Sequence, residues 1–406
     1  MTIALLGTMD TKGLEHGFVA ERIRARGHRT LVIDLGTDGP PQLAPDVSRE
    51  KVAAFAGLDL AALVARHDRG EAVAAMAKAA AIILPKLYAE GRIDGVISLG
   101  GGGGTAIATA GMRALPLGFP KVMVSTLASG HTAHYVGVKD IVMFPSIVDV
   151  AGLNRLSRTL LTRAAGAICG MVESELPTAD ADRPIIAASM FGNTTDCVQH
   201  AKQRLEAAGY EVLVFHATGI GGRTMESLIE SGLVAGVLDI TTTEWADEFV
   251  GGFLGAGPTR LEAAARRGVP AIVTPGCLDM VNFHAPDTVP ARFAGRTFYH
   301  HNPQVTLMRT NAVECAELGR ILAEKVNLST GPATVLLPLR AISVISAAGQ
   351  PFHDPAADAA LFGAIKSHLR ADIPVVEVDA AINDPAFAEA CAERLLAQLA
   401  PTRAPK

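Results

Sequence analysis

The sequence predicts an α/β fold made of two Rossmann-like domains, each with a doubly wound parallel sheet, related by internal duplication. Three observations support this prediction. Apolar runs of strand length alternate with alanine-rich helical stretches, which is typical of parallel sheets covered by helices on both faces. The succession of strand, polar loop, helix and second strand occurs in each half. With 406 residues, the chain can also bury two separate cores.

The two halves begin on the same plan. Each opens with an apolar strand, passes through a loop of glycine, hydroxyl and acidic residues into a helix closed by glycine, and continues into a second strand. Two later strand segments of the first half also have counterparts in the second. The matching segments are 3–34 with 185–216, 94–100 with 235–241, and 118–126 with 268–275.

The segment 173–183 separates the halves. It is acidic, rich in turn-forming residues and free of apolar periodicity, so we interpret it as a linker. The domains are then expected at 1–178 and 184–400. Ligands of open parallel sheets bind beyond the carboxyl ends of the strands. We therefore expect a cleft between the two domains, with loops contributed by both.

Composition narrows the class of protein. Hydrophobic residues make up 49% and charged residues 19%, which describes a compact globular chain. The net charge is −5 and no run of Lys or Arg occurs, so neither nucleic acid nor an anionic membrane surface is an expected partner. No apolar stretch reaches membrane length without a polar break, and the first residues read as a short strand rather than a signal peptide.

The five cysteines are scattered, with no CxxC spacing. This pattern argues against a zinc site or a disulfide framework and favours a reducing compartment. Together with the N-terminal segment, it predicts a cytoplasmic protein.

Five consecutive glycines are the strongest functional signal. Gly100, Gly101, Gly102, Gly103 and Gly104 lie between a strand-like run and a helix-like run that starts at Thr105. Ordering glycine costs backbone entropy, so such a run indicates a need for bare backbone. Its amides and the positive end of the helix suit a phosphate or a carboxylate. A loose turn is the alternative interpretation.

Two other loops of the first half carry compatible groups. The first contains Thr8, Met9, Asp10, Thr11 and Lys12. Its hydroxyls and ammonium suit a phosphate, and the Asp10 carboxylate suits Mg²⁺, directly or through water. The other, at 125–131, adds Thr126, Gly130 and His131. Each loop alone could be a polar turn, but three on parallel strands predict a shared site.

The commonest nucleotide motifs do not apply. The sequence contains no G-x-x-x-x-G-K-[ST], which excludes a P-loop NTPase. A G-x-G-x-x-A match within the glycine run is nearly automatic, and the strand that ends at Thr126 carries no acidic residue to bind a ribose. NAD is therefore disfavoured.

Loops of the second half are rich in ionisable groups. Glu244 follows three threonines, and Cys277, Asp279 and His284 share one segment. Asp279 with His284 is a candidate acid–base pair, whereas Cys277 is expected to be a buried, inert thiol. Arg309, or alternatively Arg260, is suited to hold a substrate carboxylate.

Six motifs taken together resemble the Tm-one-like ATP-binding family over essentially the whole chain. They lie at 7–13, 100–104, 241–244, 278–283, 301–309 and 349–352. The resemblance implies two Rossmann-like domains, ATP with Mg²⁺ in the first domain, and a homodimer or higher homo-oligomer. It places ATP on the loops Thr8–Lys12 and Gly100–Thr105. It implies no settled reaction.

Two classes of function remain open at this point. In the first, the protein is an enzyme that uses ATP to act on a small carboxylated metabolite, with Glu244, Asp279 or His284 moving protons and Arg309 holding the carboxylate. In the second, ATP locks a non-catalytic module that binds a protein partner. A third alternative is that the glycine loop binds another anion, such as a phosphosugar or an acyl-CoA.

Overall fold

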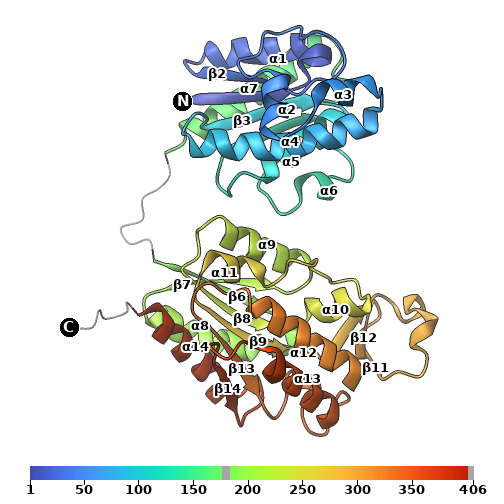
Figure 1. Ribbon diagram of the computed structural model, residues 1–406, viewed down its shortest axis with the longest axis vertical. Helices are drawn as coiled ribbons and strands as arrows, with labels where there is room; N and C mark the ends of the chain where they lie inside the picture. Colours follow the sequence, from blue (N-terminus) through green and yellow to red (C-terminus); the bar gives the residue numbers. More distant parts are fainter. Residues whose placement is uncertain (176–182, 401–406) are drawn as a thin grey trace. The chain divides into compact units, whose positions relative to one another are not determined.

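The computed structural model describes residues 1–175 and 183–400. The chain divides into two compact units, Met1–Thr178 and Ala179–Lys406, each a sheet flanked by helices (Figure 1). Most of the predicted linker, residues 176–182, lies outside the described residues. The fold class predicted from the sequence is confirmed in both units.

The first unit contains a five-stranded parallel sheet with strand order β2-β1-β3-β4-β5. The central strands are buried on both faces, as expected for a sheet that is covered on both sides. The order reverses between β1 and β3, which is the switch point where ligands bind in such sheets. The strands are β1 (Thr2–Gly7), β2 (Arg29–Asp34), β3 (Gly95–Gly100), β4 (Lys121–Ser125) and β5 (Val142–Pro145).

Helices cover this sheet with two separate cores. On one face, α2, α4 and α5 pack on alternate strand residues such as Leu6 and Val96. On the other face, α1 and α7 pack on the intervening residues, such as Leu5 and Ile97. The helices are α1 (Met9–Arg24), α2 (Arg49–Phe55), α3 (Leu60–Ala65), α4 (Arg69–Ala89), α5 (Gly102–Arg113), α6 (Ala133–Val136) and α7 (Arg155–Glu173).

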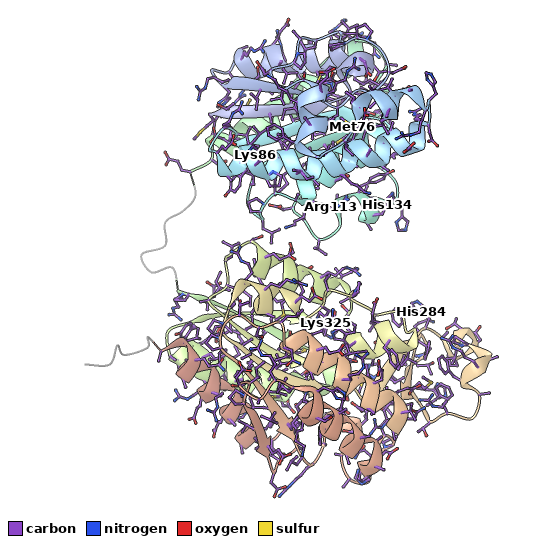
Figure 2. All side chains as sticks on the ribbon, in the orientation of Figure 1. Met76, Lys86, Arg113, His134, His284 and Lys325 are labelled. Carbon is purple, nitrogen blue, oxygen red and sulfur yellow. The ribbon has the colours of Figure 1, made fainter. Side chains whose placement is uncertain are left out.

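Among the described residues, α4 is the one helix whose length and composition would suffice to cross a membrane, with a mean hydropathy of 1.5. Its apolar face, however, is a core face. Met76 is fully buried against the sheet, whereas Lys86 on the other side is exposed (Figure 2). The apolar character of α4 therefore reflects packing within the domain.

The second unit repeats the first strand order and extends it. Its six-stranded sheet has the order β7-β6-β8-β9-β13-β14, so its first five strands correspond to β2-β1-β3-β4-β5. This agreement confirms the internal duplication. The strands are β6 (Ile185–Met190), β7 (Glu211–His216), β8 (Gly236–Thr241), β9 (Ala271–Gly276), β13 (Ala333–Pro338) and β14 (Val375–Val378).

Two helical layers enclose the second sheet. Helices α8 and α14 pack on one face, and α9, α11, α12 and α13 pack on the other. Asparagine and aspartate caps begin several of these helices; Asn311, for example, forms a capping box with Glu314 at the start of α12. The helices are α8 (Thr195–Ala207), α9 (Ile220–Glu230), α10 (Glu244–Val250), α11 (Glu262–Arg267), α12 (Ala312–Val326), α13 (Pro355–His368) and α14 (Pro385–Leu399).

A three-stranded antiparallel sheet interrupts the second domain between β9 and α12. Its order is β10-β12-β11, with β10 (Met280–Phe283), β11 (Phe298–Asn302) and β12 (Val305–Arg309). The duplication does not predict this sheet, because the first domain has no corresponding segment between β4 and β5.

Candidate functional site

A cavity of about 560 Å³ opens in the first domain at the carboxyl ends of its strands. This volume lies within the usual range for small-molecule sites. Loops after β1, β2 and β3 line the cavity together with the turn between α3 and α4, so it lies at the predicted switch point. The lining includes Thr8, Asp10, Thr11, Lys12, Asp38, Leu63, Val64, Arg69, Val73 and Gly100–Gly104.

The glycine run forms one wall of the cavity. Gly100 ends β3, Gly101 is extended, and Gly102, Gly103 and Gly104 form the first turn of α5. The first amides of a helix have no acceptor within the helix, so they are free to bind a ligand. No acidic residue lies in this turn to compete for them.

Most of these glycines are not required by the packing of the protein itself. None has a positive φ. A Cβ added to Gly101 or Gly102 would meet nothing nearer than 3.8 Å, and one added to Gly104 nothing nearer than 3.7 Å. Only Gly100, at 3.1 Å from Gly104 Cα, and Gly103, at 3.4 Å from Val73, would be tight. Packing within the described residues therefore does not account for the missing side chains at Gly101, Gly102 and Gly104.

The loop after β1 brings its hydroxyls and its lysine to the same cavity. The Oγ1 atoms of Thr8 and Thr11 are 2.9 Å apart. Lys12 is half-buried and leaves helical geometry, with φ −128° and ψ 20°, while its carbonyl lies 2.8 Å from Nδ1 of the buried His16. Met9 does not face the cavity; its side chain is buried, and its amide donates to the Asp34 carboxylate at 3.0 Å.

Asp10 faces the loop after β2. Its Oδ2 accepts the Asp38 amide at 2.8 Å and lies 3.8 Å from the Arg49 guanidinium. Its Oδ1 is buried and has no hydrogen-bond partner. In this arrangement Asp10 positions the β2 loop, and its carboxylate is largely shielded from the cavity.

The predicted contribution of the loop after β4 is mostly peripheral. Thr126, Gly130 and His131 are exposed, and none of them lines the cavity. Thr126 is the nearest, since its Oγ1 would lie 3.8 Å from a Cβ at Gly101. Thr105 is fully buried, and its hydroxyl bonds that of Ser125 at 2.7 Å, which ties the start of α5 to the end of β4.

Several lining residues have no signal in the sequence. Arg69 begins α4, and its Nη2 lies 3.9 Å from the position of a Cβ at Gly103, so a cation flanks the glycine amides. Asp38, Leu63 and Val64 line other parts of the cavity. They occur in ordinary polar or apolar stretches, and only the fold brings them to the glycine run.

The corresponding strand end of the second domain is closed. Thr241 ends β8 and is followed by Thr242, Thr243 and Glu244, just as Gly100 ends β3 and is followed by Gly101–Gly103. All four residues of the second domain are fully buried. Glu244 Oε1 accepts the amides of Gly219 and Gly222 at 2.7 and 3.0 Å. Glu244 thus satisfies amides at the start of α9, as an anionic ligand would.

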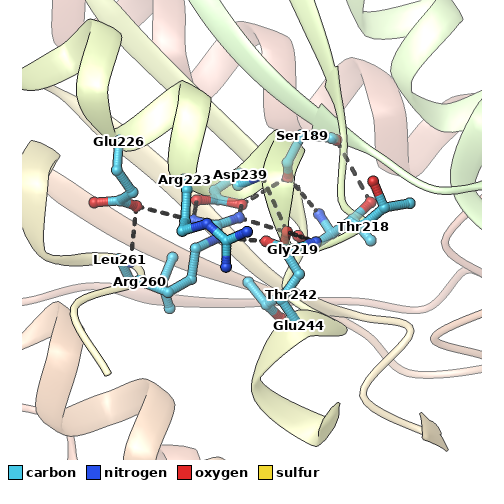
Figure 3. A network of polar contacts seen from close by, with 12 residues as sticks. Ser189, Thr218, Gly219, Arg223, Glu226, Asp239, Thr242, Glu244, Arg260 and Leu261 are labelled. Carbon is cyan, nitrogen blue, oxygen red and sulfur yellow. Dashed lines mark hydrogen bonds and ion pairs between the residues drawn. The ribbon is translucent and has the colours of Figure 1, made fainter. Parts of the chain in front are cut away.

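Arg260 bonds Glu244 together with two other carboxylates (Figure 3). Its Nε donates to Glu244 at 2.7 Å, and its two terminal nitrogens donate to Asp239 at 2.6 and 2.7 Å. It also donates to Glu226 at 3.1 Å and is only 1% exposed. Burial raises the pKa of the Glu226 carboxyl, while the guanidinium lowers it. Arg260 and Glu244 are therefore partners in a buried ion network.

The other predicted acid–base residues are not brought together. Asp279 is fully buried, its Oδ2 accepts the Ser343 hydroxyl at 2.7 Å, and burial raises the pKa of its carboxyl to about 6. His284 is exposed and stacks on Phe253 (Figure 2). Among the described residues, no hydrogen bond or ion pair joins His284 to Asp279, so the structure gives no support to this pair.

The Arg309 guanidinium is also engaged by groups of the chain itself. It is 5% exposed, and it donates to the Phe352 carbonyl at 2.8 Å and to Asp358 at 2.6 Å. Few of its donors remain for a substrate carboxylate. Cys277 is fully buried, and burial raises the pKa of its thiol well above the usual value, which matches the expected inert cysteine.

Comparison with known proteins identifies relatives over the whole chain. Models of the N-terminal and C-terminal domains of the Uncharacterised protein family (UPF0261) match residues 1–177 and 183–399. A UPF0261 protein of Clostridium tetani is 49% identical over 97% of this chain and 98% of its own length. One of Rhizobium meliloti is 51% identical over 96% of each chain.

A plant relative supports the predicted resemblance. The ToMV susceptible protein tm-1(GCR26) of Solanum lycopersicum is 37% identical over 96% of this chain, which spans 55% of the tomato protein. The resemblance to Tm-one-like proteins is thereby confirmed. Among solved structures, the match to a Streptomyces glycosyltransferase, SsfS6, covers 68% of this chain and 82% of that chain, at 15% identity and a TM-score of 0.21.

Proposed function

We propose, on the premise that this chain belongs to the UPF0261 family, that it is a nucleotide-binding protein whose first domain holds ATP in the cavity at Gly100–Gly104. One observation carries the proposal: Gly101, Gly102 and Gly104 line a cavity of ligand size at the start of a helix, and packing does not explain why these residues lack side chains. A phosphate chain supplies the missing partner.

The charges around the glycine run fit a phosphate chain. Lys12 and Arg69 line the cavity from two different elements, and Thr8 and Thr11, whose hydroxyls are in contact, line it as well. Cations and hydroxyls on several sides of a helix N-terminus neutralise and orient phosphate oxygens. In this arrangement the glycine amides bind the phosphates directly.

We propose that Mg²⁺ enters with the phosphates. Mg²⁺ is commonly held by one or two carboxylates, several waters and substrate phosphates. Asp10 fits this role in part: its Oδ1 has no hydrogen-bond partner, but the atom is shielded and would reach a metal-bound water only if the side chain turned outward. When bound, the ion would supply charge neutralisation of the phosphates.

Two functions remain to be compared: an enzyme that acts on a carboxylated metabolite, and a non-catalytic module that ATP locks. The case for an enzyme acting on a carboxylated metabolite rests on the ionisable loops of the second domain. Glu244, Asp279 and Arg309 are buried and bonded within the chain, which favours the module that acts through a protein partner. The cleft between domains and the homo-oligomer remain predictions. ATP turnover, measured with and without small organic acids, distinguishes the two classes.

Calorimetric titration with ATP tests the proposal. We expect saturable binding to the parent protein, stronger with Mg²⁺. Gly102→Val and Lys12→Ala should each weaken it by about tenfold or more, since one blocks the amides and the other removes a cation. Gly166→Val and Lys78→Ala are matched controls: Gly166 has nothing within 4 Å of its Cβ position, and neither residue lines the cavity. Absence of ATP binding to the parent would refute the proposal.

A further inference from the structure

The cavity is chemically two-sided. The glycine amides lie after β3, and the cations Lys12 and Arg69 lie in the loop after β1 and at the start of α4. A second part of the lining is apolar. Leu35, Leu63, Ala72 and Ile107 are buried, and Val64 and Val73 are half-buried. A phosphate chain gains nothing from such surface, whereas a flat apolar group gains roughly 25 cal/mol for each Å² removed from water. The ligand is therefore expected to carry an apolar part as well as its phosphates.

Part of this apolar wall belongs to the first domain alone. Between β2 and β3 the chain forms α2, α3 and α4, whereas between the equivalent β7 and β8 it forms only α9. Leu63 and Val64 lie on α3, His67 lies in the turn after it, and Arg69 begins α4; all four line the cavity. The extra helices are thus found in the domain with the open cavity, and they build one of its walls.

Asp38 adds a carboxylate to the same cavity. Its side chain is exposed and has no hydrogen-bond or ion-pair partner among the described residues. Its backbone is held in place, because its amide donates to Asp10 Oδ2 at 2.8 Å. An ionised carboxylate only accepts hydrogen bonds and repels phosphate, so it selects a part of the ligand that offers donors. Neighbouring hydroxyls of a ribose are such donors.

The sheet order sets the distance between these groups. The loop after β2, with Asp38, and the loop after β3, with the glycines, are separated by β1. Neighbouring strands are about 4.8 Å apart, so the two loops are about 10 Å apart. This separation keeps Asp38 out of contact with a phosphate at the glycine amides. It leaves Asp38 beside the group that follows the phosphates in a nucleotide.

From this arrangement we infer that the cavity selects a ribonucleotide: Asp38 binds the ribose hydroxyls, and the wall formed by Leu35, Leu63 and Val64 holds the base. The inference rests on the proposed function, because it takes the phosphates to lie at Gly101–Gly104. It adds two specificity-determining elements that the phosphate site does not require.

Titrations of the full chain with ATP, 2′-deoxy-ATP and inorganic tripolyphosphate test this inference. The proteins are the parent, Asp38→Asn, Val64→Ala and the control Asp287→Asn, whose exposed carboxylate lies in the second domain. We expect the parent and the control to bind ATP about tenfold more tightly than deoxy-ATP. Asp38→Asn should bind both alike, with unchanged affinity for tripolyphosphate. Val64→Ala should weaken both nucleotides severalfold and leave tripolyphosphate unchanged.

The outcomes separate the two proposals. If the parent binds tripolyphosphate as tightly as ATP, or does not distinguish ATP from deoxy-ATP, the ribonucleotide inference is wrong while the phosphate site stands. If Asp38→Asn weakens tripolyphosphate as much as ATP, or acts only when Mg²⁺ is present, Asp38 supports the loop or a metal instead, and the inference is again wrong. If no probe binds to the parent, both proposals fail.

Discussion

In the first domain, β3 ends in five glycines that border an open cavity, whereas in the second domain the equivalent strand β8 ends in three threonines and Glu244, all fully buried. The two strands occupy equivalent positions: β3 lies between β1 and β4, and β8 lies between β6 and β9. The difference lies in the residue at the start of the helix that follows each strand. In the second domain this residue is Glu244, which bonds amides at the start of α9, the helix after β7, and is neutralised by Arg260. In the first domain the equivalent position is Gly103, and no acidic residue lies in the first turn of α5.

This contrast shows how a duplicated fold can hold one site rather than two. A helix N-terminus attracts an anion whatever its source. In the second domain the Glu244 carboxylate, paired with the buried Arg260, takes the place of a bound anion at the helix start, so that its contacts there are structural. A run of glycines leaves the position free, at a cost in backbone entropy that stability alone does not justify. Function therefore has to be argued from each site and not from the fold.

The largest effect is expected from removal of the central cation of the closed end. Arg260→Ala leaves Glu226, Asp239 and Glu244 buried without their partner, which should lower the free energy of unfolding by about 3–5 kcal/mol. Urea unfolding followed by the fluorescence of Trp245, the only tryptophan, reports on this domain. The control Arg320→Ala removes exposed ion pairs and should cost at most about 1 kcal/mol. Equal losses of stability in the two variants would show that the buried network around Arg260 does not hold this strand end closed.

A smaller effect is expected from one added methyl group in each domain. Gly222→Ala would place a Cβ 2.1 Å from Glu244 Oε2, so it should destabilise the protein by about 1–3 kcal/mol. Gly104→Ala meets nothing nearer than 3.7 Å and lies in a helix, so it should stabilise α5 by about 0.5–1 kcal/mol while weakening ATP binding. Thermal unfolding monitored by circular dichroism measures both. If Gly104→Ala proves destabilising, the glycine run has a structural purpose after all.

The most gradual effect concerns pH. Burial raises the pKa of the Asp247 carboxyl, which follows Glu244 on α10, from its usual value to about 7. Because the pKa is raised in the folded state, the protonated Asp247 carboxyl adds to the stability of the fold at low pH, and this contribution is lost as pH rises through about 7. Between pH 4 and 7 the parent should lose up to about 1.4 kcal/mol per pH unit relative to Asp247→Asn. A stability difference that stays constant with pH, measured by urea titration at each pH, would show that Asp247 ionises normally.

Several features of the fold were predictable because they depend on local pattern. The segments 94–100 and 235–241 are recognisable as strands from their apolar residues alone. They form β3 and β8, which occupy equivalent positions in the two sheets. The antiparallel sheet β10-β12-β11 was not predicted as a unit, because its strands are short and β10 pairs with β12 across a long intervening segment. The repeat offers no template for it.

The candidate site was predicted only in part. The residues that could be recognised lie close together in short segments that follow a strand, so their pattern is visible in the sequence. They are Gly100–Gly104, Thr8, Thr11 and Lys12. Arg69 and Asp38 were not, because only the order β2-β1-β3 and the packing of α4 bring them to the glycines. Glu244, Asp279 and Arg309 had the right chemistry for catalysis, but sequence spacing does not reveal that neighbours bury and satisfy them.

The sequence by itself determined the elements of this protein, their duplication and the loop that leaves its backbone bare, because apolar periodicity and glycine content act over a few neighbouring residues. Only the tertiary structure decided which charged loops remain open. Whether a carboxylate faces a cavity or a buried arginine depends on partners from distant segments, such as Glu244 and Arg260, which meet only when the sheet and its helices have packed.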